Sequence, residues 1–351
     1  MKLRTIGLVA VLALAAGGVA ACDAPQPVAA SGISCAAGSI KAQGSSAQTN
    51  AVNAWIRNYQ VSCPDATIEY DSTGSGAGLR AFIAGTGDFA GSDSALTSAD
   101  QPRADARCRT GPAIHLPMVI GPIALAYNVA GVGDLRLRPA TLAKIFAGAV
   151  SRWNDPAIVA DNPGTPLPST PIRTVHRSDS SGTTDNFTTF LAATAAGDWT
   201  FGAAGTWSAP GGSAQRGSNG VAATIARSDG AIGYIEASYA RFHNLATARI
   251  GNGAGEFVAL TDEAAGRTVA GAKSAGDLRL EIDYWTTAAG AYPIVLVTYE
   301  VVCQSGTPEL VKSFLTYTAS PAGQAAATRL GYAPLPEQLR DRVAAAVTAL
   351  G

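Results

Sequence analysis

Three short turns rich in serine, threonine and glycine contain the residues best suited to chemistry in this chain. They span residues 44–46 (GSS), 73–78 (TGSGAG) and 179–184 (DSSGTT), and each comes just before a segment with a helical pattern. Such residues can simply cap a helix, but a helix N-terminus also offers unpaired N–H groups and a partial positive charge that attract an anion. Together the turns predict a site for a small tetrahedral oxyanion. The hydroxyl groups that could donate to it belong to Ser46, Ser75, Ser181 and Thr183.

Two charged residues accompany these turns. Arg177 lies four residues before Ser181, where its guanidinium group could bind two anion oxygens at once. Asp93 lies in a Gly-Ser-Asp-Ser segment, and its carboxylate would repel an anion unless the ligand has a proton to donate, as monohydrogen phosphate does and sulfate does not. Taken alone, each has a simpler interpretation: Asp93 is a turn residue, and Arg177 forms a surface ion pair with Asp179.

The segments that must position these residues alternate between strand and helix patterns, which predicts an α/β fold with mixed, largely parallel sheets. Strands are expected over residues 39–43, 67–70, 114–128, 172–176, 232–234 and 294–302. Helices are expected over residues 47–60, 78–84, 139–147, 184–195, 309–318 and 336–350. Segment 114–128 is almost continuously apolar, which is typical of a buried strand that passes from one lobe to another. Trp285 and Tyr292 are expected to pack where the chain crosses back.

In these motifs the chain resembles the periplasmic phosphate-binding protein of the phosphate-specific ABC transporter, in its lipid-anchored form. The matching stretches, in family order, are AQGSSAQTNAVNAWIRNY, TGSGAGLRAF, DFAGSDSAL, VIGPIALAYNV, KIFAGAVSRWNDPAI, VHRSDSSGTTDNFTTFL, DGAIGYIE and AYPIVLVTYE. The resemblance implies a two-lobed periplasmic-binding-protein clamshell of type II, with a hinge of two crossing segments, that closes on one phosphate. We expect lobe I over residues 34–120 and 292–351, and lobe II over residues 121–291.

The resemblance also implies a set of ligand residues and partners. The family's ligand positions match Ser46, Ser75, Asp93, Arg177, Ser181, Gly182 and Thr183. The family often has threonine at the first position and a bulky aromatic residue at the next, where this chain has Ala47. The implied partners are inorganic phosphate and the permease and ATPase subunits of the transporter, served by a monomer without a cofactor.

The N-terminus is typical of an export signal. Lys2 and Arg4 precede an apolar run over residues 6–16, which is shorter than the roughly 20 residues of a membrane span. Small residues followed by Cys22 resemble a bacterial lipoprotein cleavage site, although an ordinary secretory signal with an unrelated cysteine is an alternative. We expect a signal peptide over residues 1–21, and a lipidated Cys22 with a flexible tether over residues 22–33. The lipid would anchor the exported protein to the outer face of the cell membrane.

Four further cysteines, an even number in an exported chain, predict two disulfides. They are Cys35, Cys63, Cys108 and Cys303. No C-x-x-C pair exists and the three histidines are far apart in sequence, which disfavours a zinc site. Three pairings are open. Because Cys63 and Cys108 each follow a helix-like segment and precede a strand-like one, the favoured pairing is 63–108 with 35–303.

Composition and missing motifs narrow the function classes. A formal net charge of −1 without a basic block argues against nucleic acid, and a hydrophobic share of 47% with only 15% charged residues argues against disorder. One alternative is the same scaffold tuned to sulfate or molybdate. Another is a secreted phosphatase or serine hydrolase that uses Ser75 or Ser181, which the absence of G-x-S-x-G, H-E-x-x-H and P-loop motifs disfavours. A third is a sensor or adhesin. We expect a binding protein and not an enzyme.

Overall fold

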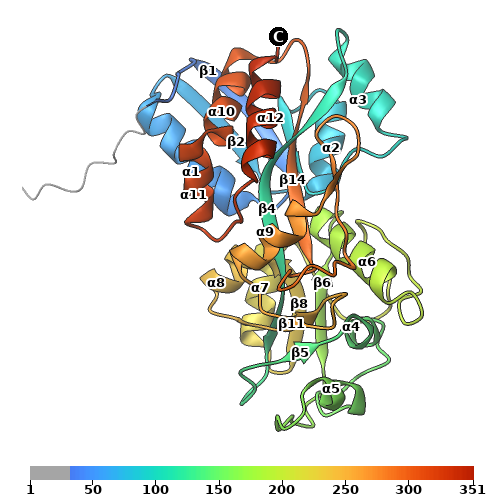
Figure 1. Ribbon diagram of the computed structural model, residues 1–351. Helices are drawn as coiled ribbons and strands as arrows, with labels where there is room; N and C mark the ends of the chain where they lie inside the picture. Colours follow the sequence, from blue (N-terminus) through green and yellow to red (C-terminus); the bar gives the residue numbers. More distant parts are fainter. Residues whose placement is uncertain (1–31) are drawn as a thin grey trace, which may run out of the picture.

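The structure, a computed structural model, describes residues 32–351. The predicted signal peptide (1–21), the predicted lipidation site Cys22 and nearly all of the predicted tether (22–33) lie outside the described residues. From residue 32 onward, no helix has the length and apolar character needed to cross a bilayer. The described chain forms a mixed α/β structure in two halves, and long strands run between them (Figure 1).

One nine-stranded sheet extends through both halves, in the order β2-β1-β3-β14-β4-β8-β6-β7, with β9 paired to β4. Its strands are β1 (Gly38–Gly44), β2 (Ala66–Asp71), β3 (Phe89–Ser92), β4 (Ala113–Asn128), β6 (Arg173–Arg177), β7 (Ser213–Gln215), β8 (Ala231–Glu236), β9 (Ala246–Thr247) and β14 (Val295–Cys303). The outer strands pair in parallel, whereas β14 and β4 pair antiparallel with their neighbours. The predicted mixed α/β sheet is confirmed. Two small sheets contain β5 (Arg136–Leu137), β10 (Arg249–Gly251) and β11 (Phe257–Val258), and β12 (Lys273–Ser274) and β13 (Leu280–Glu281).

Helices surround both ends of the sheet (Figure 1). They are α1 (Thr49–Ser62), α2 (Ser75–Ile83), α3 (Gln101–Cys108), α4 (Pro139–Phe146), α5 (Pro156–Asp161), α6 (Gly182–Thr194), α7 (Gly217–Arg227), α8 (Ala237–Phe242), α9 (Asp262–Ala270), α10 (Glu309–Ala319), α11 (Pro321–Thr328) and α12 (Glu337–Thr348). We call strands β1 to β3 with α1 to α3 and α10 to α12 the β1 half. Strands β6 to β8 with α4 to α8 are the β6 half.

Strand β4 connects the two halves, as the apolar pattern over residues 114–128 predicts. Its first part pairs with β14 and its last part pairs with β8. The register with β14 shifts beside Pro117, a residue without an N–H group to contribute to the ladder. Tyr292, just before β14, is fully buried here and donates a hydrogen bond to the Ile123 carbonyl at 2.7 Å, as expected of a packing residue at the crossing. Trp285 differs from expectation, because 50% of it is exposed to solvent.

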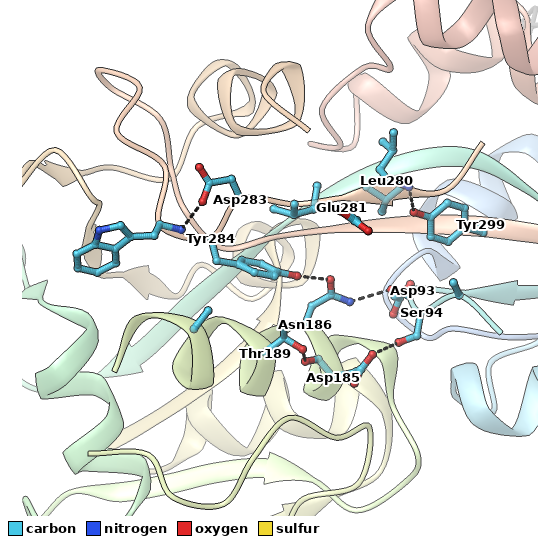
Figure 2. A pocket seen from close by; sticks show the side chains of 15 residues that line it. Asp93, Ser94, Asp185, Asn186, Thr189, Leu280, Glu281, Asp283, Tyr284 and Tyr299 are labelled. Carbon is cyan, nitrogen blue, oxygen red and sulfur yellow. Dashed lines mark hydrogen bonds between the residues drawn. The ribbon is translucent and has the colours of Figure 1, made fainter. Parts of the chain in front are cut away.

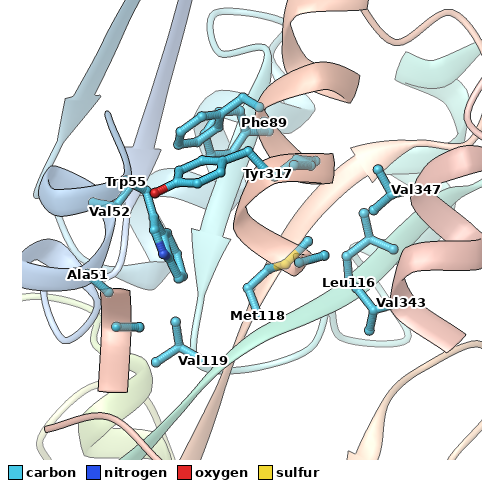
Figure 3. Packing of buried hydrophobic residues seen from close by; sticks show 14 of the residues in the cluster. Ala51, Val52, Trp55, Phe89, Leu116, Met118, Val119, Tyr317, Val343 and Val347 are labelled. Atoms are coloured by element: carbon cyan, nitrogen blue, oxygen red, sulfur yellow. The ribbon is translucent and has the colours of Figure 1, made fainter. Parts of the chain in front are cut away.

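Each half has its own apolar core. In the β1 half, one face of α1 buries Val52, Trp55 and Tyr59, the helical spacing that the sequence shows. Figure 3 shows Trp55 packed among residues of several elements, and its indole N–H donates to the Gly323 carbonyl at 2.7 Å. The core of the β6 half gathers large aromatic residues, including Phe146, Trp153, Phe187, Phe190 and Tyr234.

Two disulfides are present, but the favoured pairing was wrong. Cys35 bonds to Cys63, and Cys108 bonds to Cys303. The reason lies in the order of the strands. Cys303 ends β14 directly opposite Ala113, the first residue of β4, which follows α3 and Cys108 closely. Cys63 ends α1 and lies beside the start of β1, where Cys35 precedes the strand. Both bridges therefore lie within the β1 half.

Candidate anion-binding site

The three predicted turns meet between the two halves. The turn after β1 contains Ser46, α2 begins at Ser75, and Ser181 is the N-cap residue of α6. The backbone N–H of Gly76 donates to the Ser180 carbonyl at 3.2 Å, so α2 and the turn before α6 touch directly. All seven predicted ligand residues are buried, and contacts among the turns gather them into one cluster.

Close packing between the two halves explains why position 182, in the last turn, is a glycine. A side-chain Cβ at this position would come within 2.5 Å of the Asp93 Cβ and 2.7 Å of the Ser75 Oγ. Both of those residues belong to the other half. Only a residue without a side chain allows the two halves to approach this closely.

The three serines share one hydrogen-bonding pattern. Each side-chain oxygen accepts from a backbone N–H: Ser46 from Ser218 at 3.0 Å, Ser75 from Asp93 at 3.1 Å, and Ser181 from Thr184 at 3.2 Å. A hydroxyl group can accept and donate at once, so each serine also keeps one proton to donate. In this structure the Ser75 hydroxyl donates to Asp93 Oδ2 at 3.4 Å, and the hydroxyls of Ser46 and Ser218 share a hydrogen bond at 3.0 Å.

Asp93 follows β3 and is only 4% exposed. Its Oδ1 accepts from the Thr298 hydroxyl at 2.8 Å, and its Oδ2 has longer contacts of 3.4 Å with the hydroxyls of Ser75 and Thr183. Burial raises the pKa of the Asp93 carboxyl, although the Ser45, Thr298 and Ser75 side chains and the charge of Arg177 oppose the shift. The side chain is therefore a turn residue in sequence but a buried hydrogen-bond acceptor in space.

Arg177 ends β6 and is 2% exposed, so its pair with Asp179 is a buried ion pair and not a surface one. The Arg177 Nε donates to Asp179 Oδ1 at 2.8 Å, and Nη2 donates to Oδ2. Burial alone would raise the pKa of the Asp179 carboxyl, but the hydrogen bonds and charge of Arg177 outweigh burial and lower it. Asp179 fixes the orientation of the guanidinium group and cancels part of its charge.

Sequence reasoning missed two contributors to the site. Helix α7 begins at Gly217, and Ser218 in its first turn reaches the Ser46 hydroxyl with both its N–H and its own hydroxyl at 3.0 Å. The Gly-Ser pair that opens this helix resembles the three predicted turns and could have revealed it. Thr298, the partner of Asp93, lies within an apolar strand, and no local pattern marks it.

A cavity of about 450 Å³ opens beside the cluster (Figure 2). Asp93 forms part of its wall, together with the carboxylates of Asp185, Glu281 and Asp283, and no lysine or arginine lines it. Such a lining repels anions, so the cluster around Arg177 and not this cavity is the candidate anion site. The Asn186 amide donates to the Asp93 carbonyl at 2.8 Å and connects α6 to the loop after β3.

The arrangement suits the binding of a small anion. It combines one arginine, three helix N-termini and several hydroxyl groups with two carboxylates: Asp179, which is paired with Arg177, and Asp93, which is buried without an ion-pair partner among the described residues. Across residues 32–351, no three His, Cys, Asp or Glu side chains are grouped so that they could hold a metal ion.

Comparisons with known proteins agree with this geometry. Residues 29–322 match the PBP superfamily domain. The chain is 44% identical over 323 residues to the phosphate-binding protein PstS2 of Mycobacterium bovis, which covers 89% of this chain and 87% of that protein. It is 40% identical over 321 residues to PstS 3 of Mycobacterium leprae, with coverages of 89% and 86%.

Solved structures add a likeness in three dimensions. A high affinity periplasmic phosphate-binding protein bound with phosphate aligns with a TM-score of 0.70 and 25% identity, over 88% of this chain and 93% of that one. The chain therefore belongs to the PstS family of phosphate-binding proteins within the PBP superfamily.

Proposed function

We propose that this chain captures inorganic phosphate and delivers it to an ABC transporter for import. The observation that carries the proposal is the buried carboxylate of Asp93, which forms no ion pair within the described residues and lies among hydrogen-bond donors. An ionised carboxylate can only accept, so it favours a ligand that has a proton to donate. Monohydrogen phosphate has such a proton and sulfate does not. The relatives named above are phosphate-binding proteins, which supports the same ligand.

Each residue of the cluster has a role in this proposal. Arg177 supplies the positive charge, and Gly182 offers its backbone N–H at the N-terminus of α6. Asp93 accepts the phosphate proton. The hydroxyl groups that donate to the phosphate oxygens belong to Ser46, Ser75, Ser181 and Thr183.

The two serines considered as nucleophiles, Ser75 and Ser181, do not form the serine–histidine pair of a typical serine hydrolase among the described residues. A serine nucleophile needs a general base within hydrogen-bonding distance. In the described chain, neither Ser75 nor Ser181 forms a hydrogen bond with a histidine; both oxygens accept from backbone N–H groups. His176, the histidine nearest in sequence, pairs its Nδ1 with the Arg177 carbonyl.

The proposal also covers the location of the protein, its partners and the division of the chain into two lobes. The exported chain is anchored to the outer face of the membrane through lipidated Cys22, and it passes phosphate as a monomer to the permease and ATPase subunits. Lobe I comprises residues 34–120 and 292–351, and lobe II comprises residues 121–291. The lobes move about β4 and the segment before β14, which cross between the halves.

Titration calorimetry of the lipid-free protein with phosphate and sulfate tests the proposal. Wild type should prefer phosphate by at least about three orders of magnitude, the scale seen when a site bonds a group that the rival lacks. Asp93→Asn can donate from its amide, so it should narrow this preference chiefly by admitting sulfate. Asp283→Asn is the matched control, because it removes a carboxylate from the neighbouring cavity and not from the cluster.

Two results would contradict the proposal. If wild type bound sulfate or molybdate as tightly as phosphate, the scaffold would be tuned to another oxyanion. An Asp93→Asn variant that excludes sulfate as strictly as wild type would show that Asp93 does not read the ligand proton.

A further inference from the structure

A second carboxyl group lies buried beneath the anion site. Glu300 is 2% exposed and comes two residues after Thr298 on β14, so both side chains point to the same face of the sheet. Thr298 binds Asp93 on that face. The Glu300 Oε2 is buried and has no hydrogen-bond partner, and the same is true of Oε1 of the neighbouring Gln48.

The other deeply buried glutamate shows that this is unusual. Glu236 caps α8, and its carboxylate accepts from both the N–H and the hydroxyl of Ser238. Burial raises the pKa of both Glu236 and Glu300 to about 8. Glu236 nevertheless has the donors that an ionised carboxylate requires. The Glu300 Oε2 has no such donor. Burial and the charge of Asp93 raise the pKa of this carboxyl, and only its contact with the Gln48 amide lowers it, so the neutral acid is favoured.

Counting protons along one chain of contacts shows what Gln48 lacks. The Tyr70 hydroxyl donates its single proton to the Ser45 carbonyl at 2.9 Å, so it must accept from the Gln48 Nε2, which lies 3.0 Å away. This fixes the orientation of the amide and leaves its Oε1 in need of a donor. A buried acceptor without a donor costs about 1–3 kcal/mol.

We propose that Glu300 is a protonated acid that donates to Gln48 Oε1, steadies the turn that carries Ser46, and weakens phosphate binding when it loses its proton. One hydrogen bond would then satisfy both unpartnered oxygens. The relay runs from Glu300 through Gln48 and Tyr70 to the Ser45 carbonyl. Glu300 is a positioning residue, because it acts on the ligand through this relay. The inference rests on the proposed phosphate-binding function.

The charges around Glu300 determine the direction of the pH effect. Asp93 is the nearest acidic group toward the ligand, Tyr70 faces Glu300 from β2, and the positive charge of Arg177 lies beyond Asp93. Burial and the nearby Glu300 hold the pKa of Tyr70 well above 10, so Tyr70 stays neutral. A negative charge on Glu300 would add to that of Asp93, repel a phosphate dianion and remove the donor to Gln48.

The direction in which pH changes phosphate affinity follows from the pKa of Glu300 and the charges around it. The pKa of Glu300 in the folded protein, about 8, lies above the ordinary value of about 4.3, so the carboxyl ionises only as the pH rises past about 8. A bound dianion raises this pKa further. Phosphate binding therefore takes up a proton in this range, and affinity falls by up to about tenfold per pH unit.

The test compares phosphate affinity at about pH 7.5 and about pH 9.5 by calorimetry. Wild type should lose about tenfold across this interval, although the share of phosphate present as dianion does not decrease. Glu300→Gln, which keeps a donor and cannot ionise, should change less than about threefold. Glu236→Gln is the matched control and should retain the wild-type profile.

Two outcomes would overturn the inference while leaving the proposed function intact. One is an equal fall in wild type and Glu300→Gln, and the other is a flat profile in Glu236→Gln alone. If Glu300→Gln fails to fold, wild type alone decides: calorimetry at about pH 8.5 in two buffers of different ionisation enthalpy should show proton uptake, and its absence overturns the inference. Loss of phosphate binding by wild type at about pH 7.5 would instead reject the proposed function.

Discussion

The two sides of the anion cluster are built from opposite chemistry. The β1 half contributes Ser46, Ser75 and Asp93, which are hydroxyl groups and a carboxylate without a cation. The β6 half contributes Arg177 and the N-terminus of α6. On the proposed function, the group that compensates the charge of the dianion and the group that accepts its proton thus lie on different sides. Tight and selective binding would then require both sides in contact.

Very small residues make that contact. Gly182 touches Ser75 and Asp93, and the Ser46 hydroxyl meets Ser218. On the proposed function, each of these contacts forms when the lobes close. The following variants distinguish two contributions to phosphate affinity: the positive charge of the β6 half and the close contact between the halves.

Removing the cation should have the largest effect. Arg177→Ala leaves the ligand charge compensated only by helix N-termini and leaves Asp179 buried without its partner, so we expect phosphate affinity to fall by about 2–5 kcal/mol. Calorimetry measures the loss. Arg173→Ala, an exposed arginine on the same strand, is the control and should bind as wild type does. If Arg177→Ala bound phosphate within tenfold of the wild-type affinity, the charge of Arg177 would not be what the β6 half contributes to binding.

Disturbing the close contact between the two halves should reduce phosphate affinity by a smaller amount. In Gly182→Ala the new methyl group would collide with Asp93 and Ser75, and overpacking of this kind costs about 1–3 kcal/mol. The loss should appear in phosphate affinity and not in the thermal stability of the ligand-free protein, because alanine favours the helix. Gly197→Ala, where the added methyl group meets no atom, is the control. Unchanged affinity in Gly182→Ala would show that close contact here is not needed for binding.

Removing one hydrogen-bond partner of the Ser46 hydroxyl should have the smallest effect on phosphate affinity. Ser218→Ala removes a hydroxyl that orients Ser46 from across the interface, but the N–H of residue 218 remains, so we expect a loss of about 0.5–1.5 kcal/mol in phosphate affinity. Ser228→Ala, at the other end of α7, should have no effect. A loss in Ser218→Ala as large as that in Arg177→Ala would mean that Ser218 contacts the ligand itself.

Much of the fold could be predicted from local patterns. The apolar run over residues 114–128 became β4, and the spacing of Val52, Trp55 and Tyr59 became the buried face of α1. These predictions succeed because burial of a face imposes its period on the sequence. The disulfide pairing failed because it depends on which strands are neighbours, and the antiparallel pairing of β14 with β4 leaves no mark near Cys303.

The site divides in the same way. The Ser/Thr-Gly turns before helices have a recognisable pattern, so the sequence pointed to Ser46, Ser75 and Ser181, which the fold gathers into one cluster. Thr298 and Glu300 could not, because a buried strand tolerates an occasional polar side chain and only the strands and helices packed on it show what that side chain meets. The burial of the Arg177–Asp179 pair likewise depends on contacts with distant segments, among them Gly217.

The disulfide between Cys35 and Cys63 also decides how the protein carries mechanical load. A pull on the chain ahead of Cys35 passes directly through the sulfur–sulfur bond to Cys63, 28 positions further along the sequence. The bypassed loop contains β1, α1 and the turn with Ser46. A molecule held by its N-terminal end can therefore bear tension without stretching that part of the anion site. With the bond reduced, the same tension would act first on β1.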